Sequence, residues 1–191
     1  MRVIAIIIAT AVGILSGLGL TWFASAGAIG FGATQIGAWM TWPKSGSAEA
    51  DPYSRAIYAR SGELPLGSTD GIAFVANSDD TGAALNGRCD IHIAGHLPNA
   101  RFWTLTVYDS EGRLIENPAE RYGFTSAEVI WKSDAEAEIV LAPHARSGNW
   151  IPTGGRERIS AVLRFYDASL GLGGRFTNKV EMPSVWQEFC P

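Results

Sequence analysis

The sequence predicts a mainly β protein: an antiparallel, jelly-roll-like β-sandwich with an N-terminal transmembrane helix and one short helix before the sheet. Three observations support this fold class. An uncharged apolar segment opens the chain, and segments of alternating apolar and polar residues follow one another beyond residue 70. Clusters of Gly, Asn, Asp and Pro separate these segments without a helical pattern between them, as in antiparallel sandwiches.

The opening segment is long enough to cross a bilayer. Residues 3–43 contain no Asp, Glu, Lys, Arg or His, and residues 3–23 are almost entirely apolar. Because about 20 helical residues span the hydrocarbon core, we assign residues 1–26 to a transmembrane anchor. The small-x-small sequence at 24–26 makes a cleaved signal peptide the alternative. Arg2 precedes the span, so the positive-inside rule places the N-terminus in the cytoplasm and the remaining chain outside it.

Small residues form a ridge along the predicted span. Ala9, Gly13 and Gly17 recur every four residues. This spacing lets two membrane helices approach closely, which predicts packing against a membrane-protein partner or a second copy of the chain. The alternative is that these positions reflect only the general abundance of glycine in membrane helices.

Residues 27–50 are predicted to be a glycine-rich interfacial segment followed by a linker. We expect Trp39 and Trp42 to act as aromatic anchors at the membrane surface. Pro43 prevents a helix from continuing, and the sequence Ser-Gly-Ser-Ala at 45–48 is typical of a flexible linker.

Residues 51–191 are predicted to form the sandwich domain. Asp51 followed by Pro52 is typical of a helix start, and Gly62 of a helix end. Strands are expected at 71–77, 88–94, 101–109, 127–132, 136–142 and 157–167. Within two of them the alternation assigns these residues to the core: Trp103, Leu105, Val107, Ile159, Ala161, Leu163 and Phe165.

The cysteines, histidines and charges restrict the chemistry. Cys89 and Cys190 are predicted to form a disulfide, because paired cysteines outside the cytoplasm tend to be oxidised; free thiols are the alternative. His92 and His96 have an H-x₃-H spacing, but they lie at a predicted strand end without further ligands, so we predict no metal and no cofactor. The net charge of −4 and the absence of a basic patch argue against nucleic acid as a partner.

Motifs of known catalytic chemistry are missing from the sequence. It contains no nucleophile elbow, no Walker A motif and no dinucleotide-binding motif after a strand, so no catalytic residue is assigned. The glycine-rich run at 171–174 follows a predicted strand and is interpreted as a loop.

Several strings together resemble the bacterial family called domain of unknown function 1214. They are the Trp-x-Leu-Thr-x-Tyr-Asp strand at 103–109, Asn117 with Arg121-Tyr122, the Asn-Trp-Ile-Pro turn at 149–152, the Leu-Arg-Phe-Tyr strand at 163–166, and the closing Pro183. The resemblance covers residues 70–190 and implies a jelly-roll-like sandwich, but it brings no established catalytic residue. Since the family is bacterial, we expect the single span to lie in the inner membrane, and the positive-inside rule then places the C-terminal domain in the periplasm.

The motif residues suggest a candidate ligand site. A polar pocket with aromatic stacking platforms would consist of Asp109, Asn117, Arg121, Asn149, Trp150, Arg164 and Tyr166. In the alternative interpretation these residues are structural. Asp109 would start a hairpin turn through Gly112, Asn149 would bond its own backbone two residues on, and Arg164 would pair with Asp109 or another carboxylate.

Three hypotheses of function follow. The first is a membrane-anchored envelope protein that acts as a binding or interaction module rather than an enzyme. The second is an uncharacterised small-molecule enzyme, for example one that acts on a carbohydrate. The third is an accessory subunit of a larger membrane complex, in which the N-terminal segment is the functional part.

Overall fold

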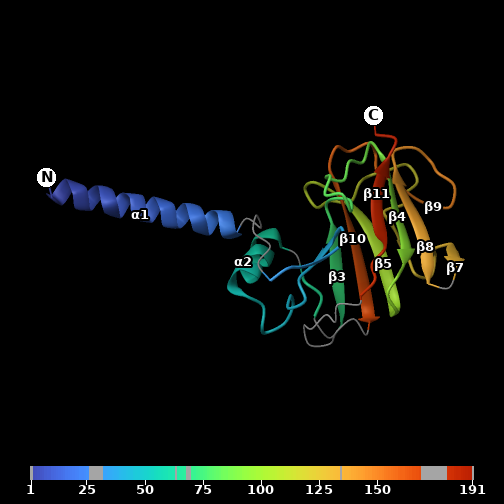
Figure 1. Ribbon diagram of the computed structural model, residues 1–191, viewed down its shortest axis with the longest axis horizontal. Coiled ribbons are helices and arrows are strands. Elements are labelled where there is room, and N and C mark those ends of the chain that lie inside the picture. The colour runs from blue at the N-terminus through green and yellow to red at the C-terminus, as the bar shows by residue number, and fades with distance from the viewer. Residues whose placement is uncertain are drawn as a thin grey trace. The chain divides into compact units, whose positions relative to one another are not determined.

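The computed structural model describes residues 2–25, 32–62, 64–67, 70–133, 135–168 and 180–190. The glycine-rich run at 171–174 lies outside them. The chain divides into two compact units, one formed by Met1–Gly32 with Lys44–Pro65 and the other by Ala33–Pro43 with Leu66–Pro191 (Figure 1).

The first unit contains both helices of the described chain. Helix α1 (Arg2–Ser25) is long and apolar enough to cross a membrane, and its large apolar side chains between Val3 and Phe23 are all more than half exposed. The N-terminal helix is thus confirmed as a helix, and the same length and composition also fit a signal sequence. A Cβ added at Gly13 or Gly17 would meet no atom within 4 Å, so this side of the helix is open.

Helix α2 (Pro52–Ser61) confirms the predicted short helix with its ends. The Asp51 carboxylate accepts hydrogen bonds from the backbone N–H groups of Tyr53 and Ser54, each at 3.0 Å. Pro52 occupies the first turn, where its missing N–H is not needed. Gly62 has a φ of 71° and donates its N–H to the Tyr58 carbonyl, which ends the helix.

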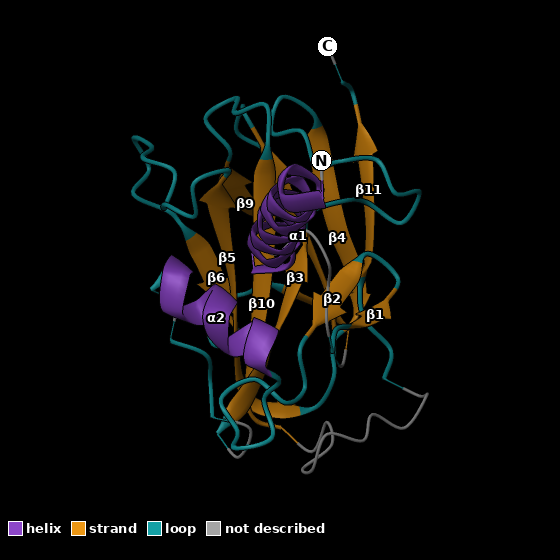
Figure 2. Cartoon of the chain, turned by 90° about the vertical axis from the view of Figure 1, so that its left-hand side faces the viewer, coloured by secondary structure: helices purple, strands orange, loops and turns teal. Residues whose placement is uncertain are grey.

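The second unit is a sandwich of two sheets. The six-stranded sheet has the order β1 (Thr34–Ile36), β2 (Trp39–Thr41), β3 (Gly71–Ala76), β10 (Ile159–Ala168), β5 (Ala100–Asp109) and β6 (Gly123–Thr125); Figure 2 shows β3 beside β10. The five-stranded sheet has the order β11 (Ser184–Glu188), β4 (Asp90–His96), β8 (Glu136–Ala142) and β7 (Trp131–Ser133), with β9 (Asn149–Pro152) also on β8. All these pairs are antiparallel except β8 with β9, which confirms the mainly β, antiparallel fold class.

The apolar faces of the strands form the core between the sheets. Leu163 lies opposite Leu105, and Phe165 opposite Trp103, and all four side chains are buried. Every residue that the alternation assigned to the core is part of the buried cluster. The alternation succeeds here because β5 and β10 are each ten residues long.

The shorter strands differ from the prediction. The expected strand at 127–132 is wrong, since residues 126–128 form a turn and β7 begins only at Trp131. Strands β1, β2, β6, β9 and β11 were not predicted. Each has three to five residues, which is too short for a period of two to be recognised.

The prediction that Trp39 is an interfacial anchor is also wrong. Trp39 lies on β2 and is fully buried in the core of the sandwich. A two-residue hairpin loop that begins with Gly37, at a φ of 57°, turns β1 back onto β2, and β2 pairs with β3. The indole N–H of Trp39 donates to the carbonyl of Pro183 at 2.7 Å, so the tryptophan has both an apolar environment and a polar partner inside the protein.

Asp80 joins the same two parts of the chain. One carboxylate oxygen accepts the backbone N–H of Ala38 at 3.0 Å, and the other accepts the N–H of Val185 at 2.9 Å. The backbone N–H of Asp80 donates to the Val185 carbonyl. The β1–β2 hairpin of one sheet and β11, an edge strand of the other, are therefore connected along one side of the sandwich.

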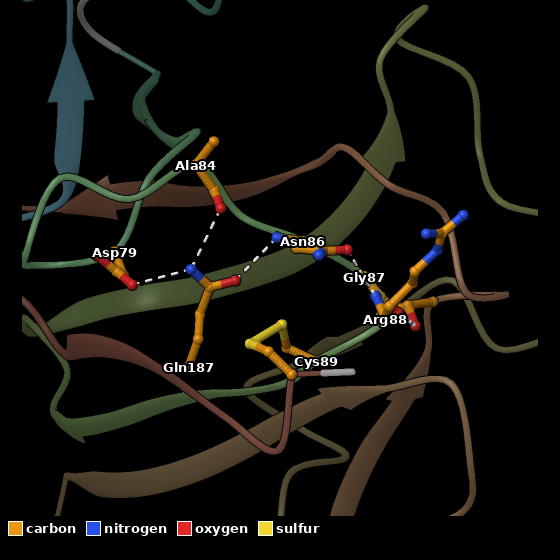
Figure 3. The surroundings of a disulfide bond; sticks show 9 residues. Asp79, Ala84, Asn86, Gly87, Arg88, Cys89 and Gln187 are labelled. Carbon is orange, nitrogen blue, oxygen red and sulfur yellow. Dashed lines mark hydrogen bonds between the residues drawn. A yellow bond between two sulfur atoms is a disulfide. The ribbon is translucent and has the colours of Figure 1, made fainter.

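The predicted disulfide between Cys89 and Cys190 is present and holds the C-terminus (Figure 3). Beside it, the Gln187 side chain donates to the Asp79 carboxylate at 2.9 Å and accepts the Asn86 N–H at 2.8 Å. The two cysteines are 101 residues apart in the sequence. Cys89 directly precedes β4 and Cys190 follows β11, so the bond links the end of β11 to the start of β4. The tail is therefore held by a covalent bond as well as by hydrogen bonds.

We expect Trp39→Ala to lower the free energy of unfolding of the sandwich by about 3–5 kcal/mol, because it removes a fully buried indole. Denaturant unfolding of the full-length protein in detergent, followed by near-UV circular dichroism, measures this change. Trp131→Ala is the matched control: Trp131 is 40% exposed and contacts Trp103 edge to face, so its loss costs about 1 kcal/mol. Equal effects of the two substitutions would contradict the assigned role of Trp39.

Candidate functional site

The outer surface of the six-stranded sheet carries a half-buried arginine. Arg164 lies on β10, and its backbone partners are Ala73 on β3 and Thr104 on β5. Its neighbours Leu163 and Phe165 point into the core, so Arg164 points away from it. The side chain is therefore held at the centre of a sheet rather than on a loop.

Aromatic rings lie close to this arginine. The guanidinium carbon of Arg164 is 5.6 Å from the centroid of the Tyr108 ring, a cation–π arrangement. Tyr166 lies opposite Phe102, with ring centroids 6.0 Å apart, and Phe102 is 37% exposed. We call this surface the Arg164 face, and it consists of Phe102, Thr104, Thr106, Tyr108, Arg164 and Tyr166.

Arg164 has no ionic partner within the described ranges. None of those residues forms a hydrogen bond or ion pair with its guanidinium, and the outward positions of β3, β10 and β5 hold no carboxylate. A guanidinium stays charged at physiological pH, and burying it partly without an anion is unfavourable. The Tyr108 ring lies 5.6 Å from the guanidinium carbon and forms no hydrogen bond with it, so the N–H donors of Arg164 remain available. The arrangement therefore favours an anion at this point.

Asp109 does not neutralise Arg164, so the expected pair of these two residues is wrong. Its carboxylate accepts the backbone N–H groups of Glu111 and Arg113, each at 2.9 Å, and lies 3.1 Å from the Arg113 guanidinium. The backbone hydrogen bond from Arg113, followed by that from Glu111 and the Arg113 side chain, holds the pKa of Asp109 below its ordinary value against the effect of desolvation. Asp109 thus shapes the hairpin turn through Gly112, as its structural interpretation expected.

Asn117, Arg121 and Trp150 lie together at the edge where β6 and β9 approach. The Asn117 amide accepts the Arg121 N–H at 3.1 Å and donates to the Arg121 carbonyl at 3.0 Å, which closes the loop between them. The Arg121 guanidinium donates to the Trp150 carbonyl at 3.2 Å. The indole N–H of Trp150 donates to the Ala142 carbonyl at 3.1 Å. These contacts are with the backbone and explain the local structure.

Asn149 is buried and connects three segments. Its side chain accepts the Ile130 N–H at 2.7 Å and donates to the carbonyls of Ile130 and Glu138. It does not bond its own backbone two residues on, so that expectation is wrong. All hydrogen bonds of the Asn149 amide go to the backbone of residues far away in the sequence. They form because β9 runs parallel to β8, which brings Asn149 close to Glu138 on β8 and to Ile130 at the end of the 126–130 turn.

The seven residues predicted as one ligand site therefore lie in separate places. Arg164 and Tyr166 share the outer surface of the six-stranded sheet. Trp150 lies opposite Val140 on the outer surface of the five-stranded sheet, which faces the other way. Asp109 and Asn149 are engaged in turns and backbone contacts, and they do not contribute to the Arg164 face.

The outer surface of the five-stranded sheet carries a second polar cluster, which the prediction missed. The His92 ring stacks on Trp186 with centroids 5.0 Å apart, and its Nδ1 lies 3.0 Å from Glu138. Lys132 pairs with the other oxygen of Glu138. The pKa of Glu138 is held below its ordinary value by the Lys132 hydrogen bond first and then by the His92 hydrogen bond. Each charged group in this cluster has a partner.

The sequence contained partial indications of both surfaces. His92 was considered only as a metal ligand, and Trp186 lies on a strand of five residues that the alternation does not reveal. In the described part of the chain no group of three or more His, Cys, Asp or Glu residues is arranged to hold a metal. The predicted alternation of 101–109 places Phe102, Thr104 and Thr106 on the face opposite the core, but the sequence does not show which charged residue lies beside them.

We expect Glu138→Gln to reduce the acid sensitivity of the sandwich. Because the folded pKa of Glu138 is lowered, its stabilising contribution is complete above the pKa of the unfolded chain and is lost as the pH falls through the folded value. Unfolding midpoints between pH 7 and pH 3 should decrease below about pH 4 in the wild type and decrease less in the variant. Glu116→Gln, which removes an exposed carboxylate in the loop before β6, is the control. An unchanged acid dependence in Glu138→Gln would contradict the assignment.

Comparison with known proteins gives the family but no activity. Among solved structures, the chain is similar to the VPA0106 protein from Vibrio parahaemolyticus, with a TM-score of 0.59 and 20% identity over 74% of this chain and 36% of that one. A putative uncharacterised protein from Burkholderia cenocepacia has a TM-score of 0.48 and 15% identity over 90% of this chain and 40% of that one. The chain thus spans less than half of either structure, and no curated protein matches it. The family model described as "Protein of unknown function (DUF1214)" matches residues 70–170, more than half of the 191 residues, and the chain therefore belongs to the DUF1214 family.

Proposed function

We propose that this chain is a membrane-anchored binding module of the bacterial cell envelope, and that its ligand site is the Arg164 face. The unpaired, half-buried guanidinium of Arg164 carries the proposal. In the His92 cluster, by contrast, the carboxylate already has a lysine and a histidine as partners. A charge that the described fold leaves uncompensated on a rigid surface is the more natural place for a ligand.

The location rests on two features of the chain. The exposed apolar side chains of α1 require an apolar environment, and a single span of the inner membrane supplies it. With Arg2 on the cytoplasmic side, the sandwich lies in the periplasm. The disulfide between Cys89 and Cys190 supports this placement, because such bonds persist in oxidising compartments.

A role as accessory subunit of a membrane complex is the second candidate. It is favoured by the ridge of Ala9, Gly13 and Gly17, where a Cβ added at either glycine has open space. A partner helix or a second copy of this chain could approach closely along that ridge. In this case the anchor supplies the contact and the sandwich extends from it.

The location is tested in living cells. Alkylation of free thiols before lysis should leave Cys89 and Cys190 unmodified, and protease added to spheroplasts should digest the sandwich. Both results are expected if the domain lies outside the inner membrane. Alkylated cysteines together with a protected domain would place it in the cytoplasm and contradict the proposal.

The binding function is tested on full-length protein extracted directly from native membranes into lipid nanodiscs. Native mass spectrometry should detect a bound small molecule on the wild type that is at least tenfold less populated on Arg164→Gln. Arg88→Gln is the control, since Arg88 pairs with Glu157 at 2.9 Å on the same domain and is not part of the Arg164 face. Equal occupancy on wild type and Arg164→Gln would contradict the site.

A further inference from the structure

We infer that the Arg164 face binds an amphiphilic anion, in which a carboxylate or phosphate group is attached to an apolar or aromatic body. This inference rests on the proposed function and adds the chemical class of the ligand. It follows from the donors that Arg164 leaves available, from the hydroxyl groups beside it, and from the apolar and aromatic side chains on either side.

The anionic part of the ligand follows from the guanidinium. Planar N–H donors at the edge of Arg164 match the two oxygens of a carboxylate or phosphate, and such pairs are frequently bidentate. The Tyr108 ring lies 5.6 Å from the guanidinium carbon, a cation–π distance. Thr104 is the direct cross-strand neighbour of Arg164, and within the described chain its hydroxyl is not engaged with another side chain. An oxyanion at this point would gain both ionic and neutral donors.

The apolar part follows from the rest of the surface. Along β10, Tyr166 and its partner Phe102 present rings on one side of Arg164, and Phe102 is 37% exposed. On the other side Val75 is half-buried, whereas Val162 beside it is already buried. An inorganic anion would not contact the rings, whereas an anion with a flat or apolar body would cover the exposed surface of Phe102 and release water from it.

The charge of the surroundings strengthens the selection for one anionic group. The chain has a net charge of −4, so Arg164 is a local positive site in an acidic protein. A polyanion would be repelled by the rest of the domain. A ligand with one anionic group and an uncharged body avoids this repulsion and still pairs with Arg164.

The inference is tested with full-length protein in nanodiscs of phosphatidylcholine, which carry no net charge. The probes are 2-naphthoate and 2-naphthyl phosphate, with 2-naphthamide as the uncharged analogue and acetate and inorganic phosphate as anions without a body. Isothermal titration calorimetry should show binding of both naphthyl anions, with affinities at least tenfold higher than those of the amide and of the two small anions. Binding of the amide as tight as that of 2-naphthoate, or of inorganic phosphate as tight as that of 2-naphthyl phosphate, would overturn the inference.

Substitutions assign the effect to the site. Arg164→Gln should weaken the binding of 2-naphthoate at least tenfold, and Arg164→Lys should weaken it less. Phe102→Ala should weaken the binding of both naphthyl anions, but 2-naphthamide should still not bind more tightly than they do. Arg88→Gln should bind like the wild type. Unchanged circular dichroism spectra show that each variant is folded, and a folded Arg164→Gln with wild-type affinity would overturn the inference. Suppose that no naphthyl anion binds, but the small molecule detected by native mass spectrometry still depends on Arg164: the inferred ligand class is then wrong and the proposed binding function stands. If the population of that small molecule is also independent of Arg164, the proposed function itself is wrong.

Discussion

The burial of Trp39 holds the two sheets of the sandwich together at one edge, and the rest of the domain depends on it. Its ring fills the core, and its N–H donates to Pro183, 144 residues later in the chain. Asp80 strengthens the same edge through Ala38 and Val185. The elements joined in this way, β1 with β2 and β11, lie outside the segment 70–170 that matches the family. In this protein the segments that flank the matched residues 70–170 therefore take part in the sandwich.

The two sheets share one core, but their outer surfaces differ in how their charged residues are paired. On the five-stranded sheet, Glu138 forms an ion pair with Lys132 and a hydrogen bond with the His92 ring. On the six-stranded sheet, Arg164 lies on a strand with partners on both sides, so the backbone fixes its position, yet no described carboxylate reaches it. Both surfaces are equally part of the sheet framework, but among the described residues the half-buried Arg164 has neither a hydrogen bond nor an ion pair, whereas Glu138 has two polar partners.

The candidate site could be predicted only in part from the sequence. Arg164 and Tyr166 were identified as residues of the Leu-Arg-Phe-Tyr motif, and they lie together on the outward side of β10. The other five predicted residues belong to the same motifs but do not lie on the Arg164 face. Asn117 closes a loop, Asn149 connects β9 to a turn, and Asp109 shapes a hairpin. Motif residues that satisfy backbone groups and motif residues that meet a ligand have the same chemical types. Their roles separate only when their partners are known.

By itself, the sequence determined the features that depend on neighbouring residues. These are the apolar helix α1, the capped helix α2, the long strands and the side of each strand that faces the core. The tertiary structure alone decided the features that depend on distant pairs: the burial of Trp39, the short strands β1, β2, β6, β9 and β11, and the absence of a described ionic partner for Arg164. The physical reason is that helix caps and alternation act over a few residues. Strand order and register, in contrast, bring together groups more than a hundred residues apart.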